Sequence, residues 1–229
     1  MREPSLVSIA HSRLDLIEFF VPITKLLPSA IAGADFVMAA GDTRVSNGYS
    51  ILKRDHSKTS QLTKTCVITS AGMVADVETL HKQLQLDVKI YKYKNKGREP
   101  TLEALASKLM QFLYSRRFMP YYAFNLLCGL DKEGKGAVYG YDAVGSYDKV
   151  TYGVQGSGVS LGAPILDNQF VGHNFIVKEL PTSIEETENT AKDIINSIAE
   201  RDIYTGDGVE VVTVTKAGVT RTVEKVRRD

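Results

Sequence analysis

The chain has 229 residues, long enough for one large domain or two small ones. Its 28 Lys and Arg residues nearly balance its 27 Asp and Glu residues, and the formal net charge is +1. This balance excludes a chain that binds nucleic acid by bulk charge alone and excludes an acidic disordered tail. Because Cys66 and Cys128 have no CxxC spacing, a disulfide framework and a cysteine-rich metal site are also excluded, and a reducing compartment is expected.

Residues 1–28 are interpreted as an N-terminal extension or propeptide-like leader. The apolar stretch 6–27 is interrupted by charged residues, and no uncharged run approaches the roughly 18 residues that a membrane span needs. A secretory signal would have one clean apolar block and a small-residue cleavage site, and neither is present. Pro22 and Pro28 would break a helix here. A single domain is therefore expected over residues 29–229.

Strands and then helices are expected in the first half of that domain. Residues 29–33 and 36–40 are short apolar runs joined by turn residues, which predicts a hairpin, and residues 49–52 and 65–69 predict two more strands. Apolar residues then recur at helical spacing over 74–88 and again from Leu102 to Phe112. Thr101 is the expected N-cap of the second helix.

Strands return in the second half. They are expected over 122–128, 137–141 and 147–152, and a glycine-rich loop at 155–158 then leads into a short helical stretch. A last helix begins with a capping box at Ser183, and its expected apolar face is Ile184, Ala191, Ile194 and Ile198. A final hairpin covers 209–223. This order predicts an α+β fold in which two antiparallel sheets lie between two helix layers.

No single motif in the sequence specifies a chemistry. The loop Gly156-Ser157-Gly158 lacks the Lys-Ser/Thr ending of a phosphate-binding P-loop, so nucleotide binding is not expected. Both cysteines lie in apolar strand patterns and are expected to be buried structural thiols. Asp42 and Arg44 would form an exposed ion pair on a turn. Metal-ligand spacing is absent among the histidines, which are His11, His56, His81 and His173.

Taken together, several separated segments resemble a β-type subunit of the 20S proteasome. They are 41–44, Lys58, 70–72, 156–158 and 201–208, in the family's order and at its spacings. The resemblance covers residues 29–229 and implies the four-layer αββα sandwich of N-terminal nucleophile hydrolases. Further segments are similar to the non-catalytic class at the sixth position of the β ring, namely 116–122, 134–139, 144–147 and 166–169.

The resemblance also implies where a nucleophile would lie. In this family, cleavage at a Gly–Thr bond exposes a threonine whose hydroxyl attacks the peptide carbonyl while its own amine acts as the base. Counting without gaps from Asp42 places this position at Leu26, and Lys25 stands where cleavage requires glycine. A leucine side chain has no oxygen to attack with. Thr24 lies two residues early in an uncleaved chain and is not expected to replace it.

The supporting positions are better kept. The resemblance matches Asp42 and Lys58 to the family's acid and lysine, and it matches Ser157, Asp202 and Thr205 to the auxiliary hydroxyl and acid set. We expect these five to be vestigial positions, with no catalytic residue, no cofactor and no metal. Asp42 and Lys58 are expected to form a buried ion pair that braces the strand turns.

The expected function is a non-catalytic structural β subunit of the 20S core particle. It would support ring assembly and ATP- and ubiquitin-dependent protein degradation by neighbouring threonine-protease subunits, in the cytoplasm and nucleus. Its expected partners are β subunits of the same and the opposite ring and α subunits, with no nucleic acid, membrane or small-molecule cofactor. The charged turn 131–136 is a candidate contact with a neighbour's substrate cleft. Two alternatives stay open, an active threonine-type endopeptidase with an atypical processing site and a glycine-loop ligand-binding domain unrelated to proteolysis.

Overall fold

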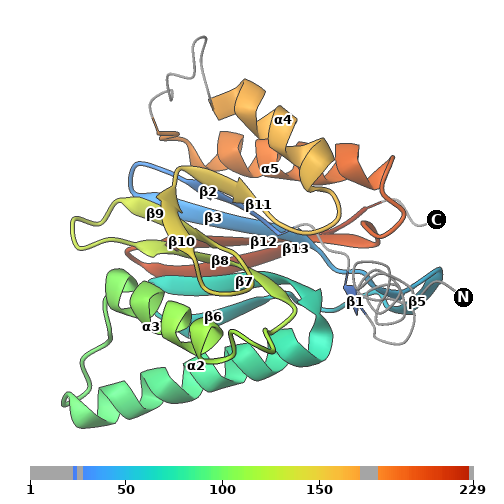
Figure 1. The fold of residues 1–229 in the computed structure, drawn as a ribbon. Helices are drawn as coiled ribbons and strands as arrows, with labels where there is room; N and C mark the ends of the chain where they lie inside the picture. The colour runs from blue at the N-terminus through green and yellow to red at the C-terminus, as the bar shows by residue number, and fades with distance from the viewer. Residues whose placement is uncertain (1–22, 25–27, 171–179, 227–229) are drawn as a thin grey trace, which may run out of the picture.

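The computed structural model describes residues 23–24, 28–170 and 180–226. Within these residues, two antiparallel sheets pack face to face, and a pair of helices covers the outer face of each sheet (Figure 1). The expected α+β sandwich with the layer order αββα is confirmed. Among the helices described, none is both long enough and apolar enough to cross a membrane.

One sheet consists of the strands β2 (Ser29–Ala32), β3 (Phe36–Asp42), β11 (Tyr152–Val154), β12 (Gly208–Thr215) and β13 (Gly218–Lys225). Their order is β11-β2-β3-β12-β13, and all neighbours are antiparallel. The two expected hairpins, β2–β3 and β12–β13, are both present. Every residue of β3 is buried, because this central strand has helices over one face and the other sheet over its second face.

The other sheet consists of the strands β1 (Ile23–Thr24), β6 (Thr59–Thr63), β7 (Cys66–Met73), β8 (Ala123–Leu130), β9 (Gly136–Tyr141) and β10 (Tyr147–Val150). Its order is β1-β7-β8-β9-β10, and β6 also pairs with β7. A small separate ribbon is formed by β4 (Val45–Asn47) and β5 (Ser50–Lys53). The short strands β4 and β6 were not predicted, since they are polar and lack alternation.

The single strand expected over residues 147–152 is wrong. The chain forms two strands there, β10 in one sheet and β11 in the other, and it passes between the sheets at Thr151. The carbonyl of Thr151 accepts a hydrogen bond from the Ala32 N–H at 2.8 Å, which ties the crossover to β2. A local apolar pattern cannot reveal that a strand changes its pairing partner.

The helices are α2 (Val74–Lys94), α3 (Leu102–Ser115), α4 (Val159–Phe170) and α5 (Ile184–Ala199). Helices α2 and α3 pack on the sheet that contains β7, and α4 and α5 pack on the sheet that contains β3 (Figure 1). Both expected N-caps are present. The Thr101 hydroxyl accepts from the Ala104 N–H, and the Ser183 hydroxyl accepts from the Glu186 N–H, each at 3.3 Å.

The apolar face of α5 differs in part from the prediction. Ala191, Ile194 and Ile198 are buried as expected, but Ile184 is 39% exposed. Thr187 and Ile195 are buried and complete the stripe instead. Ile184 belongs to the first turn, at the end of the stripe, and periodicity does not tell where along a helix the packing begins.

The two sheets approach each other closely where β9 begins. The Gly136 N–H donates to the Gly33 carbonyl at 3.1 Å, across the β2–β3 turn. A Cβ atom at Gly136 would lie only 1.9 Å from the Phe36 carbonyl oxygen. Backbone therefore occupies the space where any side chain would stand.

We expect Gly136→Ala to lower the free energy of unfolding by about 1–3 kcal/mol or more, because backbone must move to admit the methyl group. Gly140→Ala, in the same strand, is the matched control. Its Cβ would meet only side-chain carbons at 3.8 and 3.9 Å, and we expect a change within about 0.5 kcal/mol. Urea unfolding of both variants measures the difference, and equal values would contradict this account of the packing.

Candidate functional site

A buried ion pair lies where β3 ends. Lys58 Nζ is 2.9 Å from Asp42 Oδ1, and the two side chains are 2% and 0% exposed. The second carboxylate oxygen of Asp42 accepts from the backbone N–H groups of Arg44 at 3.2 Å and Gly206 at 3.4 Å. The expected buried pair is thus present, and it joins the end of a central strand to the segment that leads into β6.

Burial changes the acidity of the lysine in this pair. Desolvation lowers the pKa of Lys58 to about 8, and the neighbouring Asp42 carboxylate opposes the shift. A lysine with such a pKa is still charged at neutral pH, yet it gives up its proton more readily than an exposed lysine. At neutral pH the charged lysine is therefore balanced by the Asp42 carboxylate inside the fold.

A second polar cluster forms where the loop before α4 meets the turn after α5. The Ser157 hydroxyl donates to Asp202 Oδ2 at 2.6 Å, and the Thr205 hydroxyl donates to the same oxygen at 2.8 Å. The Tyr204 N–H donates to the other carboxylate oxygen at 3.1 Å. The fold thus brings together three of the positions singled out from the sequence, although Ser157 and Asp202 are 45 residues apart.

The turn after α5 connects the two clusters. Thr205 is buried and bonds to Asp202, and the next residue, Gly206, donates its N–H to Asp42. Asp207 then adopts a left-handed backbone conformation with φ of 69°. This turn therefore links Asp202 to Asp42 through the Thr205 hydroxyl and the Gly206 N–H.

Arg44 anchors this turn, and its expected exposed pair with Asp42 is wrong. Its side chain is 6% exposed, its Nε lies 2.7 Å from Asp207 Oδ2, and its guanidinium donates to the Ile203 carbonyl at 2.9 Å. Arg54 pairs with the other oxygen of Asp207. Burial raises the pKa of Asp207, but the hydrogen bonds from Arg44 and Arg54 outweigh that effect and hold it below its usual value. No local pattern could predict a partner 163 residues away.

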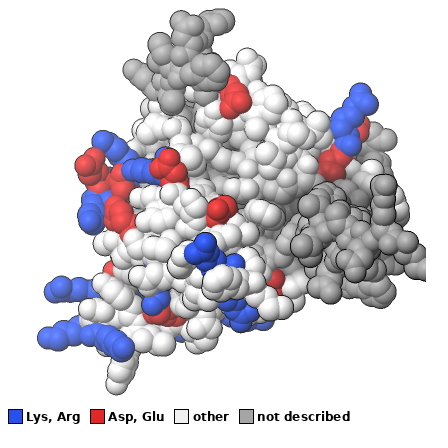
Figure 2. Space-filling model, viewed as in Figure 1, with Lys and Arg blue, Asp and Glu red and all other residues white. Residues whose placement is uncertain are grey.

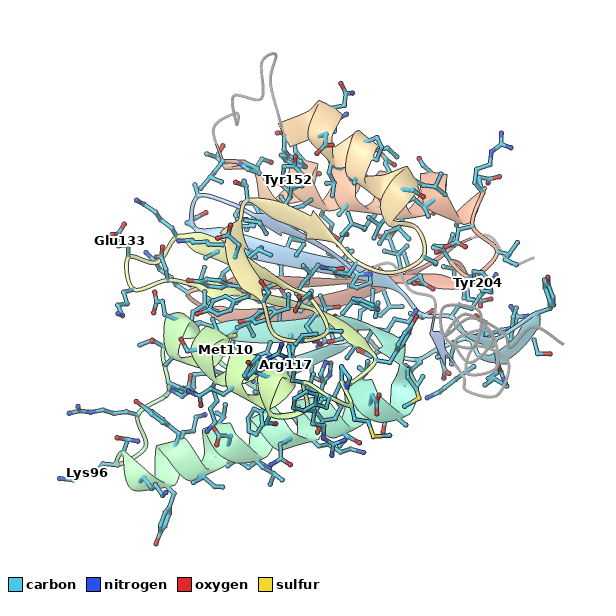
Figure 3. The ribbon with its side chains drawn as sticks, in the orientation of Figure 1. Lys96, Met110, Arg117, Glu133, Tyr152 and Tyr204 are labelled. Atoms are coloured by element: carbon cyan, nitrogen blue, oxygen red, sulfur yellow. The ribbon has the colours of Figure 1, made fainter. Side chains whose placement is uncertain are left out.

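Two hollows border these clusters. Lys58 lines a pocket of about 280 Å³ between the segment before β6 and α2. Ser157 and Asp202 line a larger cleft of about 620 Å³, and Figure 3 labels another of its residues, Tyr204, on the side of the molecule near β1. The remaining residues of the larger cleft are Ala71, Gly72, Tyr122, Phe124, Gln155, Gly156 and Val159.

The short strand β1 pairs with β7 at Gly72, one of the residues that line this cleft. In β1, Ile23 pairs with Met73 and Thr24 pairs with Gly72, antiparallel to β7. Lys25 and Leu26, the predicted nucleophile position, lie outside the described residues, as does the side chain of Thr24. His11 and His173 also lie outside them.

A buried polar chain behind the smaller pocket was not predicted. The Ser70 hydroxyl donates to Asn125 Oδ1 at 2.6 Å, so its oxygen is left to accept a hydrogen bond from His81 Nε2–H at 2.7 Å. The other ring nitrogen of His81 is 2.9 Å from the Ser60 hydroxyl. Desolvation lowers the pKa of His81 to about 4, and the ring is therefore neutral near pH 7.

The described residues contain no group of three or more His, Cys, Asp or Glu residues placed to hold a metal ion. Cys66 and Cys128 are free and buried, as expected. Burial raises the pKa of both thiols, which keeps them protonated and unreactive.

The sandwich and its lysine–carboxylate cluster define a protein of the N-terminal nucleophile hydrolase type. The proteasome subunit family matches residues 29–214. The chain is 45% identical to proteasome subunit beta type-1 of Oryza sativa subsp. japonica, covering 87% of this chain and 92% of that protein. It is 44% identical to proteasome subunit beta type-1-B of Carassius auratus, covering 87% and 84%. It is 37% identical to proteasome subunit beta type-6 of Saccharomyces cerevisiae, covering 87% and 86%. The chain belongs to the proteasome subunit family and is one of its β subunits.

We expect Lys58→Met to lower the free energy of unfolding by about 3–5 kcal/mol, because it leaves the buried Asp42 carboxylate without its cation. Lys53→Met is the control. Lys53 lies 4.0 Å from Asp55 in an exposed pair, so its loss should cost less than about 1 kcal/mol. Denaturant unfolding compares them, and a similar small loss in both would show that the buried pair does not brace the fold.

We expect His81 to make the fold sensitive to acid. Its folded pKa of about 4 lies below the ordinary value of 6.5, so the unfolded chain binds the proton more readily. The contribution of His81 to the free energy of unfolding is complete above about pH 6.5. It decreases as the pH drops toward 4, by at most about 1.4 kcal/mol per pH unit. Unfolding of the wild type and of His81→Gln across this window tests the effect, and parallel curves would rule it out.

Proposed function

We propose that this β subunit is non-catalytic and serves as a structural member of the β ring, at the sixth position. One feature of the sequence supports the proposal: counting without gaps from Asp42 puts Leu26 at the position of the family's threonine nucleophile. A hydrocarbon side chain can neither attack a carbonyl nor pass on a proton. Lys25 stands before it in place of glycine, so the junction that would release a free amine is also missing.

The retained polar clusters are compatible with a structural role. Removing one member of a buried ion pair costs several kcal/mol, so selection for folding alone would keep Asp42 and Lys58. Asp202 likewise ties Ser157 to Thr205 and thereby holds the turn after α5 against the loop before α4. These contacts support the fold whether or not a nucleophile stands beside them.

The same clusters favour one alternative, an active threonine-type endopeptidase with an atypical processing site. Asp42 and Lys58 lie in salt-bridge contact, and the auxiliary hydroxyls are hydrogen bonded to Asp202. This alternative needs a hydroxyl at a newly formed amino terminus. The nearest hydroxyl in the sequence is that of Thr24, two residues before the matched position.

The proposed partners are the β subunits of the same ring and of the opposite ring, and α subunits, in the cytoplasm and nucleus. Neither nucleic acid nor a membrane nor a small-molecule cofactor is part of the proposal. The turn 131–136 is a proposed contact with a neighbour's substrate cleft. Asp131 organises it by accepting the N–H groups of Glu133 and Lys135, each at 2.9 Å. Figure 3 places Glu133 on the opposite side of the molecule from Tyr204, so the turn projects away from this chain's own cleft.

We expect an epoxyketone or lactone probe to leave this subunit unmodified when the whole core particle is treated. Catalytic neighbours in the same sample are the internal control and should carry the adduct. Intact-mass analysis of the separated subunits reads both results and also gives the mature N-terminus. An adduct on this chain, or a mature chain that begins with Thr or Ser, would favour the active endopeptidase instead.

Native mass spectrometry of the endogenous complex tests the proposed partners. The subunit should appear in a hetero-oligomer with α and β subunits and should be released from that complex only on dissociation. A chain recovered as a monomer outside any such complex would contradict the structural role.

A further inference from the structure

The last two residues of α3 and the loop that follows it are exposed, although they include large apolar side chains. Every residue from 114 to 120 is exposed, and Phe118 and Met119 are 96% and 84% exposed. Two large apolar side chains thus stand side by side in water. Contiguous exposed apolar surface is typical of sites where another protein binds. Figure 3 labels Arg117 on this loop, in front of the sheets where the chain leaves α3.

This loop is held in shape by its own contacts. The Arg116, Arg117 and Met119 N–H groups donate to carbonyls three residues earlier, at 3.0–3.1 Å. The Arg116 guanidinium lies 4.4 Å from the ring centre of Tyr121, which is buried and anchors the end of the loop. Arg117 donates to the Tyr114 hydroxyl at 3.1 Å. Phe118 and Met119 are therefore presented on an ordered support, which lowers the entropy lost on binding.

The charge around the two apolar side chains is positive and unneutralised. From residue 104 to residue 122 the sequence contains no Asp or Glu. Among the salt bridges of the described residues, none involves Arg116 or Arg117, whose guanidinium groups instead lie over aromatic rings. The nearby carboxylate of Asp76 accepts the Tyr122 N–H at 2.8 Å. Figure 2 shows a small positive patch within largely uncharged surface in this part of the face.

We propose that residues 114–120 form a docking knob that places Phe118 and Met119 in an apolar pocket on a neighbouring proteasome subunit, with carboxylates at the pocket rim pairing with Arg116 and Arg117. The inference rests on the proposed function as a ring subunit. Rigid aromatic and arginine side chains at a protruding tip have the composition of interface hot spots. Guanidinium groups that pair with no carboxylate among the described residues are suited to a carboxylate on another chain.

A second copy of this chain does not fit the knob. A symmetric contact would bring the same patch of both copies together, and four arginine side chains would then meet without an intervening acid. Like charges placed together across an interface are unfavourable. The occupant is therefore a different subunit of the complex.

The test measures how well variant chains compete with the wild-type chain for incorporation into the assembled core particle. Wild-type and variant chains carrying different mass labels are expressed together with the other subunits, and their ratio in the complex is compared with their ratio in the whole extract. We expect the double variant Phe118→Ala, Met119→Ala to be depleted from the complex at least about tenfold, and Arg117→Glu likewise. All three positions are exposed, so the fold itself should be unaffected.

Matched controls stand elsewhere on the surface. Tyr93→Ala removes an aromatic side chain that is 91% exposed on α2, and Arg98→Glu reverses an exposed charge beyond that helix. Both should enter the complex as the wild type does. Equal entry of knob and control variants would overturn this inference and leave the proposed function standing. Failure of the wild-type chain itself to enter would overturn both.

A photo-crosslink identifies the occupant. Benzoylphenylalanine at position 118, in chains assembled into the complex, should capture a peptide of another subunit in which apolar residues lie next to Asp or Glu. Capture of a second copy of this chain, or of a peptide without nearby acids, would overturn the stated chemistry.

Discussion

At the end of β3 the Asp42 carboxylate is fully buried, and its charge must be balanced inside the fold. Once Asp42 is removed from water, it needs a cation and hydrogen-bond donors, and the fold supplies Lys58 and the N–H groups of Arg44 and Gly206. Each of these comes from a different segment, so a single carboxylate fixes how a central strand, the segment before β6 and the turn after α5 meet. Arg44 and Asp207 form a second buried ion pair beside the first. Together the two pairs hold the loops at this end of the sandwich in place.

Contacts of this kind explain how a family can keep its fold in members that differ in catalytic activity. The residues that tune a nucleophile in this family also hold the loops together here, so their contacts stabilise the fold whether or not a nucleophile stands beside them. Lys58 still has a depressed pKa, and Asp202 still gathers two hydroxyls. Their presence is therefore weak evidence for activity. Whether such a site is active is decided by the nucleophile itself, because that residue can be replaced without destabilising the fold.

The sequence was sufficient for the layers, the helix caps and most strands, because apolar spacing and capping residues act locally. The sequence did not predict features that depend on contacts between distant segments or on which partner a segment pairs with. The crossover at Thr151 depends on which sheet each half of one apolar segment joins. The pairing of Arg44 with Asp207 depends on a contact across the whole chain, and the bonds of His81 to Ser60 and Ser70 depend on how α2 lies on its sheet. Asp42, Lys58, Ser157, Asp202 and Thr205 were found only through resemblance, since spacing alone does not bring them together.

The position of β12 between β3 and β13 has a consequence for the order of events during synthesis. Residues 36–42 leave the ribosome long before residues 208–215, which complete the pairing of that central strand. Until then, one side of β3 has unpaired backbone groups, and the Asp42 carboxylate lacks the Gly206 donor. The central sheet of the nascent domain therefore stays open along one side of β3 until the last hairpin has emerged.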